Sequence, residues 1–156
     1  MPFTGDRLGV KPLEVAIAII EQDGKFLMQL RDDIPGIIHP GVWGLFGGHL
    51  APGEKPETGL KRELIEEINY AVDTLSQFDC YASSGVIRHT FYTPLLITID
   101  QLELKEGWDF GLVTPEDIRR GYCYSDQAGE ERLIADIHQK ILLDFIVSRL
   151  PSASGG

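Results

Sequence analysis

The sequence has few cysteines, and it has no apolar segment long enough to cross a membrane. Cys80 and Cys123 are the only cysteines among 156 residues, and they form no CxxC pair, so neither a zinc ribbon nor a disulfide framework is predicted. No apolar run reaches the ~18–20 residues that span a bilayer, and residues 1–15 lack the basic start and apolar stretch of a signal peptide. We therefore expect a cytoplasmic protein with reduced thiols and no membrane partner.

Basic residues are also scarce. The chain has 14 Lys and Arg against 24 Asp and Glu, which gives a formal net charge of -10. Proteins that bind polynucleotides usually carry clustered basic side chains, so a polynucleotide partner is not expected. A small polyphosphate is compatible with this charge if divalent cations lie between its oxygens and protein carboxylates.

The length and the apolar content predict one globular domain. Apolar residues make up 43% of the chain, which is enough for a core in a domain of this size. We expect a single domain over residues 1–150 and a flexible tail over residues 151–156, because the tail consists of small and turn-forming residues.

Local patterns predict alternating strands and helices. Two β-branched apolar runs, residues 13–20 and 25–31, flank Asp23-Gly24, which is a strong hairpin signal. Residues 32–44 are rich in Gly and Pro and are expected to form a loop. The further expected elements are a helix over about residues 56–68, strands over 77–82 and 86–99 with an interruption at Pro94, a short helix starting at Thr114, and a helix over about 128–149. Mixed strands with a middle and a terminal helix indicate a layered α/β sandwich.

The segment from Gly48 to Tyr70 separates charged from apolar residues when it is wound as a helix. Glu63, Glu66 and Glu67 have the spacing i, i+3 and i+4, so their carboxylates are expected on one face. Three adjacent carboxylates raise the pKa of at least one of them unless a cation lies among them. Because the cluster has only hard oxygen ligands, Mg²⁺ or Mn²⁺ is favoured over zinc. A solvated acidic helix face is the alternative for such a cluster taken alone.

The polar residues of this segment also have the spacing of a known signature. Gly48 is followed after five residues by Glu54, then after seven residues by Arg62-Glu63-Leu64, and after one more residue by Glu66-Glu67. This pattern resembles the signature of the Nudix hydrolase family over 23 positions. The family usually has Gly where this chain has Asn69, and Asn is the next most tolerant residue for a left-handed conformation at a helix end. We expect this change to alter the helix C-terminus and to leave the metal site intact.

The resemblance implies a Nudix-type α/β/α sandwich with a mixed central sheet and the activity of a divalent-metal-dependent pyrophosphohydrolase. In such proteins the loop and the helix hold Mg²⁺, or Mn²⁺ as the alternative, against a diphosphate. The implied metal ligands are Glu63, Glu66, Glu67 and the backbone carbonyl of Gly47. Glu66 and Glu63 are the implied catalytic residues, with Glu66 as a third ligand or as the base.

Other residues of the motif are implied to have structural roles. Gly48 belongs to the loop, and Glu54 and Arg62 would pair to fix the loop against the helix. A carboxylate from outside the helix often completes such a site, and Glu106 is the candidate here, with Asp109 second. An ordinary polar turn is the alternative at both of these positions.

Four residues are candidates for substrate binding. Arg31 and Arg88 could meet phosphate or ribose, although a surface charge is an equal alternative for each. Phe46 lies directly before the glycines and is a stacking platform or a core residue. Tyr122 belongs to a region that resembles a substrate-proximal loop.

The expected reaction is in-line attack of water on a phosphorus of a nucleoside diphosphate linked to another moiety. A nucleoside triphosphate or a nucleotide sugar is favoured as this small nucleotide substrate, and a homodimer is left open. ADP-ribose and dinucleoside-polyphosphate hydrolases often have a Pro or Tyr shortly after the motif, and residues 85–88 have neither. NADH-type members usually carry four zinc-binding cysteines. A non-catalytic nucleotide-binding module on the same fold normally loses motif glutamates, and an allylic diphosphate isomerase has active-site motifs that are not found here.

Overall fold

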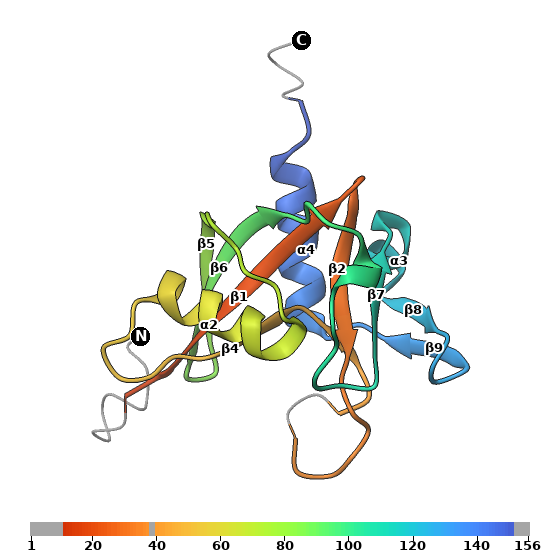
Figure 1. The fold of residues 1–156 in the computed structure, drawn as a ribbon, viewed down its shortest axis with the longest axis horizontal. Helices are drawn as coiled ribbons and strands as arrows, with labels where there is room; N and C mark the ends of the chain where they lie inside the picture. The colour runs from red at the N-terminus through yellow and green to blue at the C-terminus, as the bar shows by residue number, and fades with distance from the viewer. Residues whose placement is uncertain (1–10, 38–39, 152–156) are drawn as a thin grey trace. The chain divides into compact units, whose positions relative to one another are not determined.

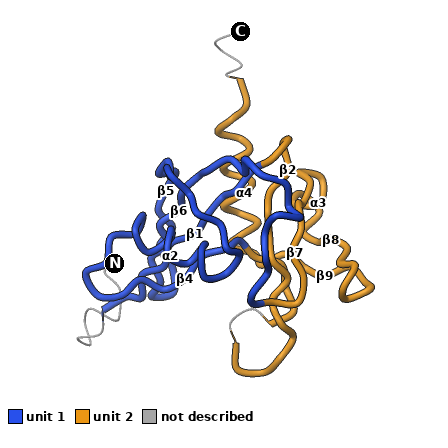
Figure 2. Tube along the Cα trace, viewed as in Figure 1, with its two compact units in different colours: residues 1–21, 45–106 blue, residues 22–44, 107–156 orange. Residues whose placement is uncertain are grey.

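The structure is a computed structural model that describes residues 11–37 and 40–151. Apart from Pro151, the expected tail therefore lies outside the described residues. The chain divides into two compact units (Figure 2). The first comprises residues 1–21 and 45–106, and the second comprises residues 22–44 and 107–156.

The first unit contains a mixed sheet built around β1 (Leu13–Gln22). This strand pairs antiparallel with β4 (Phe46–His49) and parallel with β6 (Val86–Pro94), and β6 pairs antiparallel with β5 (Ser76–Ser83) (Figure 1). The apolar run of β1 is buried between these neighbours, as its β-branched composition predicts. Strand β6 ends at Pro94 and not at residue 99 as expected, because the ladder with β1 stops at the pair Glu21–Pro94. The hydrogen bond from Leu95 N to Glu21 O closes this parallel ladder.

Helix α2 (Pro56–Ile68) has the bounds that the sequence predicted. Pro56 occupies the first turn, where its missing N–H costs nothing. The helix ends at Asn69, whose φ of 56° and ψ of 39° are the left-handed conformation expected for the residue that replaces Gly. The helix stripe is fully buried and consists of Leu60, Leu64 and Ile68. After α2 the chain passes through a short 3₁₀ helix, η1 (Ile99–Gln101).

The second unit contains the other strands and two helices. Strand β2 (Lys25–Leu30) pairs antiparallel with β3 (Trp43–Gly44) and with β7 (Asp109–Val113). Strands β8 (Tyr122–Ser125) and β9 (Glu130–Leu133) form a separate hairpin. The turn before β2 is left-handed at Asp23 (φ 54°) and Gly24 (φ 78°), as an Asp-Gly hairpin signal predicts.

Helix α3 (Pro115–Arg120) begins at the expected N-cap. The Thr114 hydroxyl accepts a hydrogen bond from Asp117 N at 3.2 Å, which satisfies one of the free N–H groups of the first turn. The helix ends at Gly121, which has a φ of 88°.

The last helix is shorter than expected. Helix α4 (Asp136–Ser148) starts eight residues after the expected position near residue 128, because residues 130–133 pair with β8. Ile134, which the sequence assigns to the helix stripe, is buried outside the helix, and its N–H donates to Gly121 O. Within α4, Phe145 packs edge-on against Phe26, with ring centroids 5.9 Å apart.

These elements confirm the α/β class with a mixed sheet. In the part of the chain that the structure describes, no helix is long and apolar enough to cross a membrane.

Candidate active site

Two adjacent glycines of β4 lie against different neighbours. A Cβ at Gly48 would lie only 2.6 and 2.7 Å from the carboxylate oxygens of Glu63, whereas a Cβ at Gly47 would overlap the backbone oxygen of Ala16 in β1. Gly48 therefore lets an α2 carboxylate lie directly against β4, and Gly47 permits a close approach of two strands.

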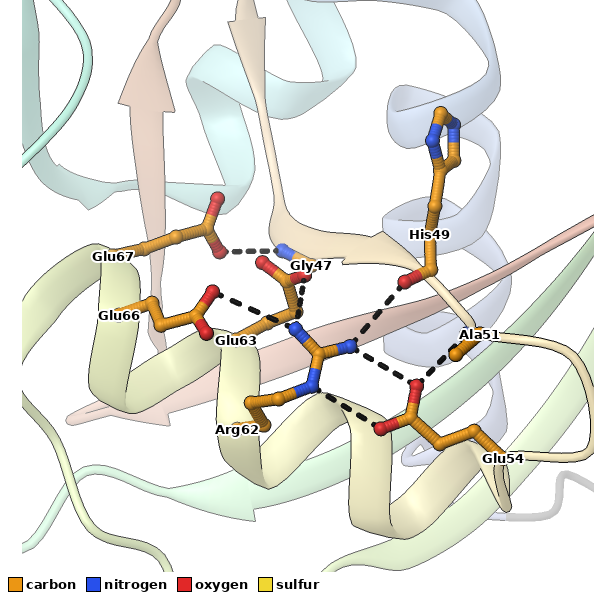
Figure 3. A network of polar contacts seen from close by, with 8 residues as sticks. All are labelled: Gly47, His49, Ala51, Glu54, Arg62, Glu63, Glu66 and Glu67. Carbon is orange, nitrogen blue, oxygen red and sulfur yellow. Dashed lines mark hydrogen bonds and ion pairs between the residues drawn. The ribbon is translucent and has the colours of Figure 1, made fainter.

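Glu67 makes a second contact between α2 and β4. Its side chain is buried, and its Oε1 accepts a hydrogen bond from Gly47 N at 3.1 Å (Figure 3). A backbone N–H thus partly compensates a carboxylate that burial would otherwise destabilise.

Arg62 ties the loop before α2 to the helix. Its Nε and Nη2 donate to the two oxygens of Glu54 at 3.1 and 3.0 Å, and Glu54 Oε1 also accepts from Ala51 N at 2.9 Å. The Arg62 guanidinium holds the pKa of Glu54 below its usual range. The structure therefore brings together the two residues that the motif implies as a structural pair.

The remaining edge of the same guanidinium faces two further carboxylates. Arg62 Nη1 lies 3.0 Å from Glu63 Oε1 and 3.5 Å from Glu66 Oε2 (Figure 3). The Glu66 side chain is 58% exposed against 17% for Glu63, so Glu66 is the more solvent-accessible carboxylate of the two.

Burial raises the pKa of the Glu63 carboxyl. The Arg62 guanidinium opposes this rise, and the negative charges of Glu66 and Glu106 add to it. The charge of Glu106 therefore acts on Glu63, although Glu106 lies far from α2 in the sequence. The segment before Glu106 is tied to the end of α2, because Lys105 N donates to Glu67 O at 2.9 Å.

Asp109 has a different environment. Its Oδ2 accepts from Ser125 Oγ at 2.7 Å and from Gln127 N at 3.4 Å, and its Oδ1 accepts from Phe110 N at 2.8 Å. Because this carboxylate is engaged within the second unit, Glu106 is the better candidate for a carboxylate from outside the helix.

The donor chemistry of this site fits a hard divalent cation. Glu63, Glu66 and Glu67 offer only oxygen, which Mg²⁺ and Mn²⁺ prefer. The Glu63 carboxylate lies directly against Gly48, where only a glycine leaves room for it. Among residues 11–37 and 40–151, no three His, Cys, Asp or Glu side chains already converge as a set of metal ligands. Two of the three carboxylates face Arg62 and the third faces Gly47 N.

Two of the candidate substrate-binding residues, Phe46 and Arg88, have environments that do not favour contact with a substrate at the α2 carboxylates. Phe46 has no exposed surface, which fits the core alternative. Gly48 faces Glu63 on α2, and its partner in β1 is Ala16. Arg88 in β6 pairs with Val15, the residue before Ala16 in β1. Since side chains alternate along a strand, Arg88 is expected on the face of the sheet opposite α2.

Arg88 has a local partner, since its Nη1 donates to Ser83 Oγ at 3.1 Å, and burial lowers its pKa. Arg31 and Tyr122 belong to the second unit, where Arg31 N donates to Val42 O and the Arg120 guanidinium lies 5.1 Å from the centroid of the Tyr122 ring. Substrate contact by these residues stays a prediction.

Two backbone groups of the network are not identifiable from the sequence. Gly47 N donates to Glu67, and His49 O lies 3.5 Å from Arg62 Nη2. Backbone groups carry no residue identity, so only the glycine motif signals that the chain approaches closely at this point.

The sequence profile of the NUDIX domain matches residues 10–131. The chain belongs to the Nudix family. The nucleoside triphosphatase NudI of Escherichia coli O17:K52:H18 (strain UMN026 / ExPEC) is 29% identical over 119 residues, which cover 67% of this chain and 83% of that protein. NudI of E. coli O1:K1 / APEC is 39% identical over 78 residues, which cover 50% of this chain and 54% of the relative, so this alignment spans about half of the relative's length.

Solved structures show the same fold. The MutT protein of Methanosarcina mazei Go1 has a TM-score of 0.68 and 20% identity, with 90% of this chain and 98% of that chain covered. A NUDIX hydrolase of Nitrosomonas europaea has a TM-score of 0.67 and 19% identity, with 89% and 72% covered. A bifunctional NMN adenylyltransferase/ADP ribose pyrophosphatase of Francisella tularensis, in complex with AMP and a Mn ion, has a TM-score of 0.63 and 18% identity, with 93% and 45% covered.

The expected fold and enzyme class are confirmed. The chain has the Nudix-type α/β fold and is a Nudix pyrophosphohydrolase. Enzymes of this family generally use divalent metal ions.

Proposed function

We propose that this Nudix hydrolase cleaves the diphosphate linkage of a nucleoside diphosphate linked to another moiety. A nucleoside triphosphate is the first candidate substrate, because the NudI relatives are nucleoside triphosphatases, and a nucleotide sugar is the second. Mg²⁺ is the proposed cofactor, with Mn²⁺ as the alternative. Residues 1–150 form one catalytic domain in this proposal.

The observation that carries the proposal is the set of carboxylates on α2 beside the glycines of β4. Glu67 accepts from Gly47 N, the Glu63 carboxylate lies against Gly48, and Glu66 is exposed on the same helix. A binding module that had lost catalysis would be expected to lack one of these glutamates. All three are present.

Glu63, Glu66, Glu67 and the Gly47 carbonyl would hold the divalent ion, and Glu106 would add a carboxylate from outside the helix. When bound, such an ion supplies positive charge to the diphosphate oxygens and makes water more acidic. Glu67 would also keep the carboxylate cluster in place, because its hydrogen bond from Gly47 N fixes one end of that cluster.

Glu63 and Glu66 are the proposed catalytic residues. One of their carboxylates takes the proton of the attacking water. The raised pKa of Glu63 favours it as a base, whereas the exposure of Glu66 makes that carboxylate accessible to a substrate. The pH dependence of kcat in E63Q and E66Q distinguishes them, because only the variant that lacks the base loses the acidic limb of the profile.

The test of this function is a panel of nucleoside triphosphates, nucleotide sugars, ADP-ribose and dinucleoside polyphosphates, assayed with Mg²⁺ and with EDTA. Release of pyrophosphate or of monophosphate shows which phosphorus is attacked. Glu67→Gln should lower kcat by about 100-fold or more, since a buried ligand is lost. Glu57→Gln is the matched control, because exposed Glu57 lies on the same helix and pairs only with Lys61, at 3.7 Å, among the ion pairs of the described residues.

Two results would contradict the proposal. Unchanged turnover in E67Q would refute the role of the carboxylate cluster. A folded wild-type protein that hydrolyses no member of the panel would favour the non-catalytic binding module.

A further inference from the structure

Arg62 is anchored independently of the proposed metal ligands. Its Nε and Nη2 both bind Glu54, and Glu54 is itself held by Ala51 N. A two-bond pair of this kind fixes both the position and the plane of a guanidinium. The positive charge is therefore held in place even when Glu63 and Glu66 move.

The remaining nitrogen, Nη1, points toward the carboxylate cluster (Figure 3). It lies 3.0 Å from Glu63 Oε1 and 3.5 Å from Glu66 Oε2. Like charges at this spacing repel each other, and a cation between them removes much of that repulsion. Arg62 thus occupies the electrostatic role that a divalent ion would have for these two side chains.

We propose that Arg62 is a built-in counter-ion, so that a divalent ion binds Glu63 and Glu66 in competition with its guanidinium. This inference rests on the proposed function, because it assigns the same two carboxylates to the metal. Because Arg62 already neutralises part of the charge of Glu63 and Glu66, a metal ion stabilises these two carboxylates less. The fixed guanidinium charge also repels the incoming cation. Arg62 therefore stabilises the metal-free site and weakens metal binding, in addition to holding the loop.

The experiment measures binding of Mn²⁺ and Mg²⁺ to the full chain without nucleotide. Free Mn²⁺ is followed by electron paramagnetic resonance, and the rise in Tm with Mg²⁺ is followed in parallel. Arg62→Gln should bind Mn²⁺ about threefold to fivefold more tightly, the range expected when one partly exposed charge is removed. The metal-free variant should melt at a lower temperature than the wild type, so its rise in Tm with metal should be larger.

Three variants separate charge from loop support. Arg62→Lys keeps the charge but cannot form the two-bond pair with Glu54, and it should stay within about twofold of the wild-type affinity. Glu54→Gln loosens the loop and leaves the guanidinium beside Glu63, so it should bind metal no more tightly than the wild type. Lys61→Gln removes the same charge from the adjacent position on α2, and its affinity should change by less than about twofold because Lys61 Nζ contacts Asp73 O and Glu57 and not the carboxylates of Glu63 and Glu66.

The outcomes are distinct. If Arg62 served only as loop support, then R62Q, R62K and E54Q would all bind metal more weakly. Weaker or unchanged metal binding in folded R62Q overturns the inference and leaves the proposed function standing. If R62Q does not fold, metal binding by R62K that is more than about twofold weaker than that of the wild type overturns the inference instead. Absence of saturable Mn²⁺ binding in the wild type overturns the metal site of the proposed function, and this inference with it.

Discussion

Gly47 and Gly48 are neighbours in β4, but we expect their replacement by Ala to damage different properties. In G48A the new methyl group meets the carboxylate of Glu63, which is the end of a flexible side chain. In G47A it meets the Ala16 carbonyl in β1, and the backbone at Gly47 has a φ of 155°. The first clash can be relieved by a rotation of Glu63, whereas the second requires a shift of backbone.

The size of each effect follows from this difference. An Ala that fits the existing backbone stabilises a protein by about 0.4–1 kcal/mol through the unfolded state, which offsets the cost of moving Glu63. The free energy of unfolding of G48A should therefore stay within about 1 kcal/mol of the wild type. G47A should lose about 2–3 kcal/mol, as is usual for overpacking that moves the main chain. At about 2–4 °C per kcal/mol, this loss lowers Tm by about 4–12 °C.

We expect G48A, the more stable of the two variants, to lose activity through its effect on Glu63. The methyl group of G48A displaces the Glu63 carboxylate from its position against Gly48, so G48A should lose about 100-fold in kcat, as expected if Glu63 is the catalytic group proposed. Scanning fluorimetry without metal and a phosphate-release assay at saturating Mg²⁺ measure the two properties. A stable G48A with wild-type kcat and wild-type Mn²⁺ affinity would refute the assignment of Glu63 to the site. A G48A that is destabilised as much as G47A would refute the view that this clash is relieved by a side chain.

Three other measurements test the environments of single residues. The raised pKa of Glu63 means that the fold disfavours its ionised form, a contribution to stability that is present below the ordinary value of 4.5 and lost as pH rises through the folded value. Metal-free E63Q should therefore gain stability relative to the wild type between pH 4 and pH 7 in urea titrations, and a constant difference would contradict this sign. Thr114→Ala should cost about 1 kcal/mol in thermal unfolding and Thr114→Ser much less, because the hydroxyl caps α3. Burial raises the pKa of Cys123 to about 12, so a thiol reagent at pH 8 should label exposed Cys80 alone in the folded protein.

The bounds of α2 were predictable because its signals are local. Pro56 marks the first turn, the carboxylates and the apolar stripe repeat at helical spacing, and Asn69 supplies the left-handed end. Each of these residues acts through backbone within one or two turns of its own position. Nothing distant was needed to place this helix.

The start of α4 was not predictable for the opposite reason. Residues 130–133 have the sequence Glu-Glu-Arg-Leu, which favours a helix by intrinsic propensity, yet they form β9 because β8 offers a partner. Gly129, with a φ of 70°, closes the turn between the two strands. The two-residue strand β3 is likewise defined by its pairing with β2, and it is too short for any periodicity.

In the site, the motif identified side chains but not their partners. The pairing of Arg62 with Glu54 came from the resemblance, whereas its contacts with Glu63 and Glu66 depend on how the guanidinium is oriented. The choice between Glu106 and Asp109 also depended on tertiary structure. The two are only three residues apart, and no local pattern shows that Asp109 binds Ser125.

The scarcity of basic residues has a specific meaning at this site. Glu54, Glu63 and Glu66 face the guanidinium of Arg62, and Glu67 accepts from Gly47 N. These four carboxylates with one guanidinium keep three formal negative charges. One divalent ion leaves one negative charge, and a second ion makes the cluster positive. If this cluster is the metal site proposed above, we expect a polyphosphate to be repelled without metal and to bind only when enough metal is present. It follows that the apparent KM for the nucleotide should fall steeply as Mg²⁺ is raised, more steeply than kcat rises. A KM that does not depend on metal would show that the substrate's phosphates bind away from these carboxylates.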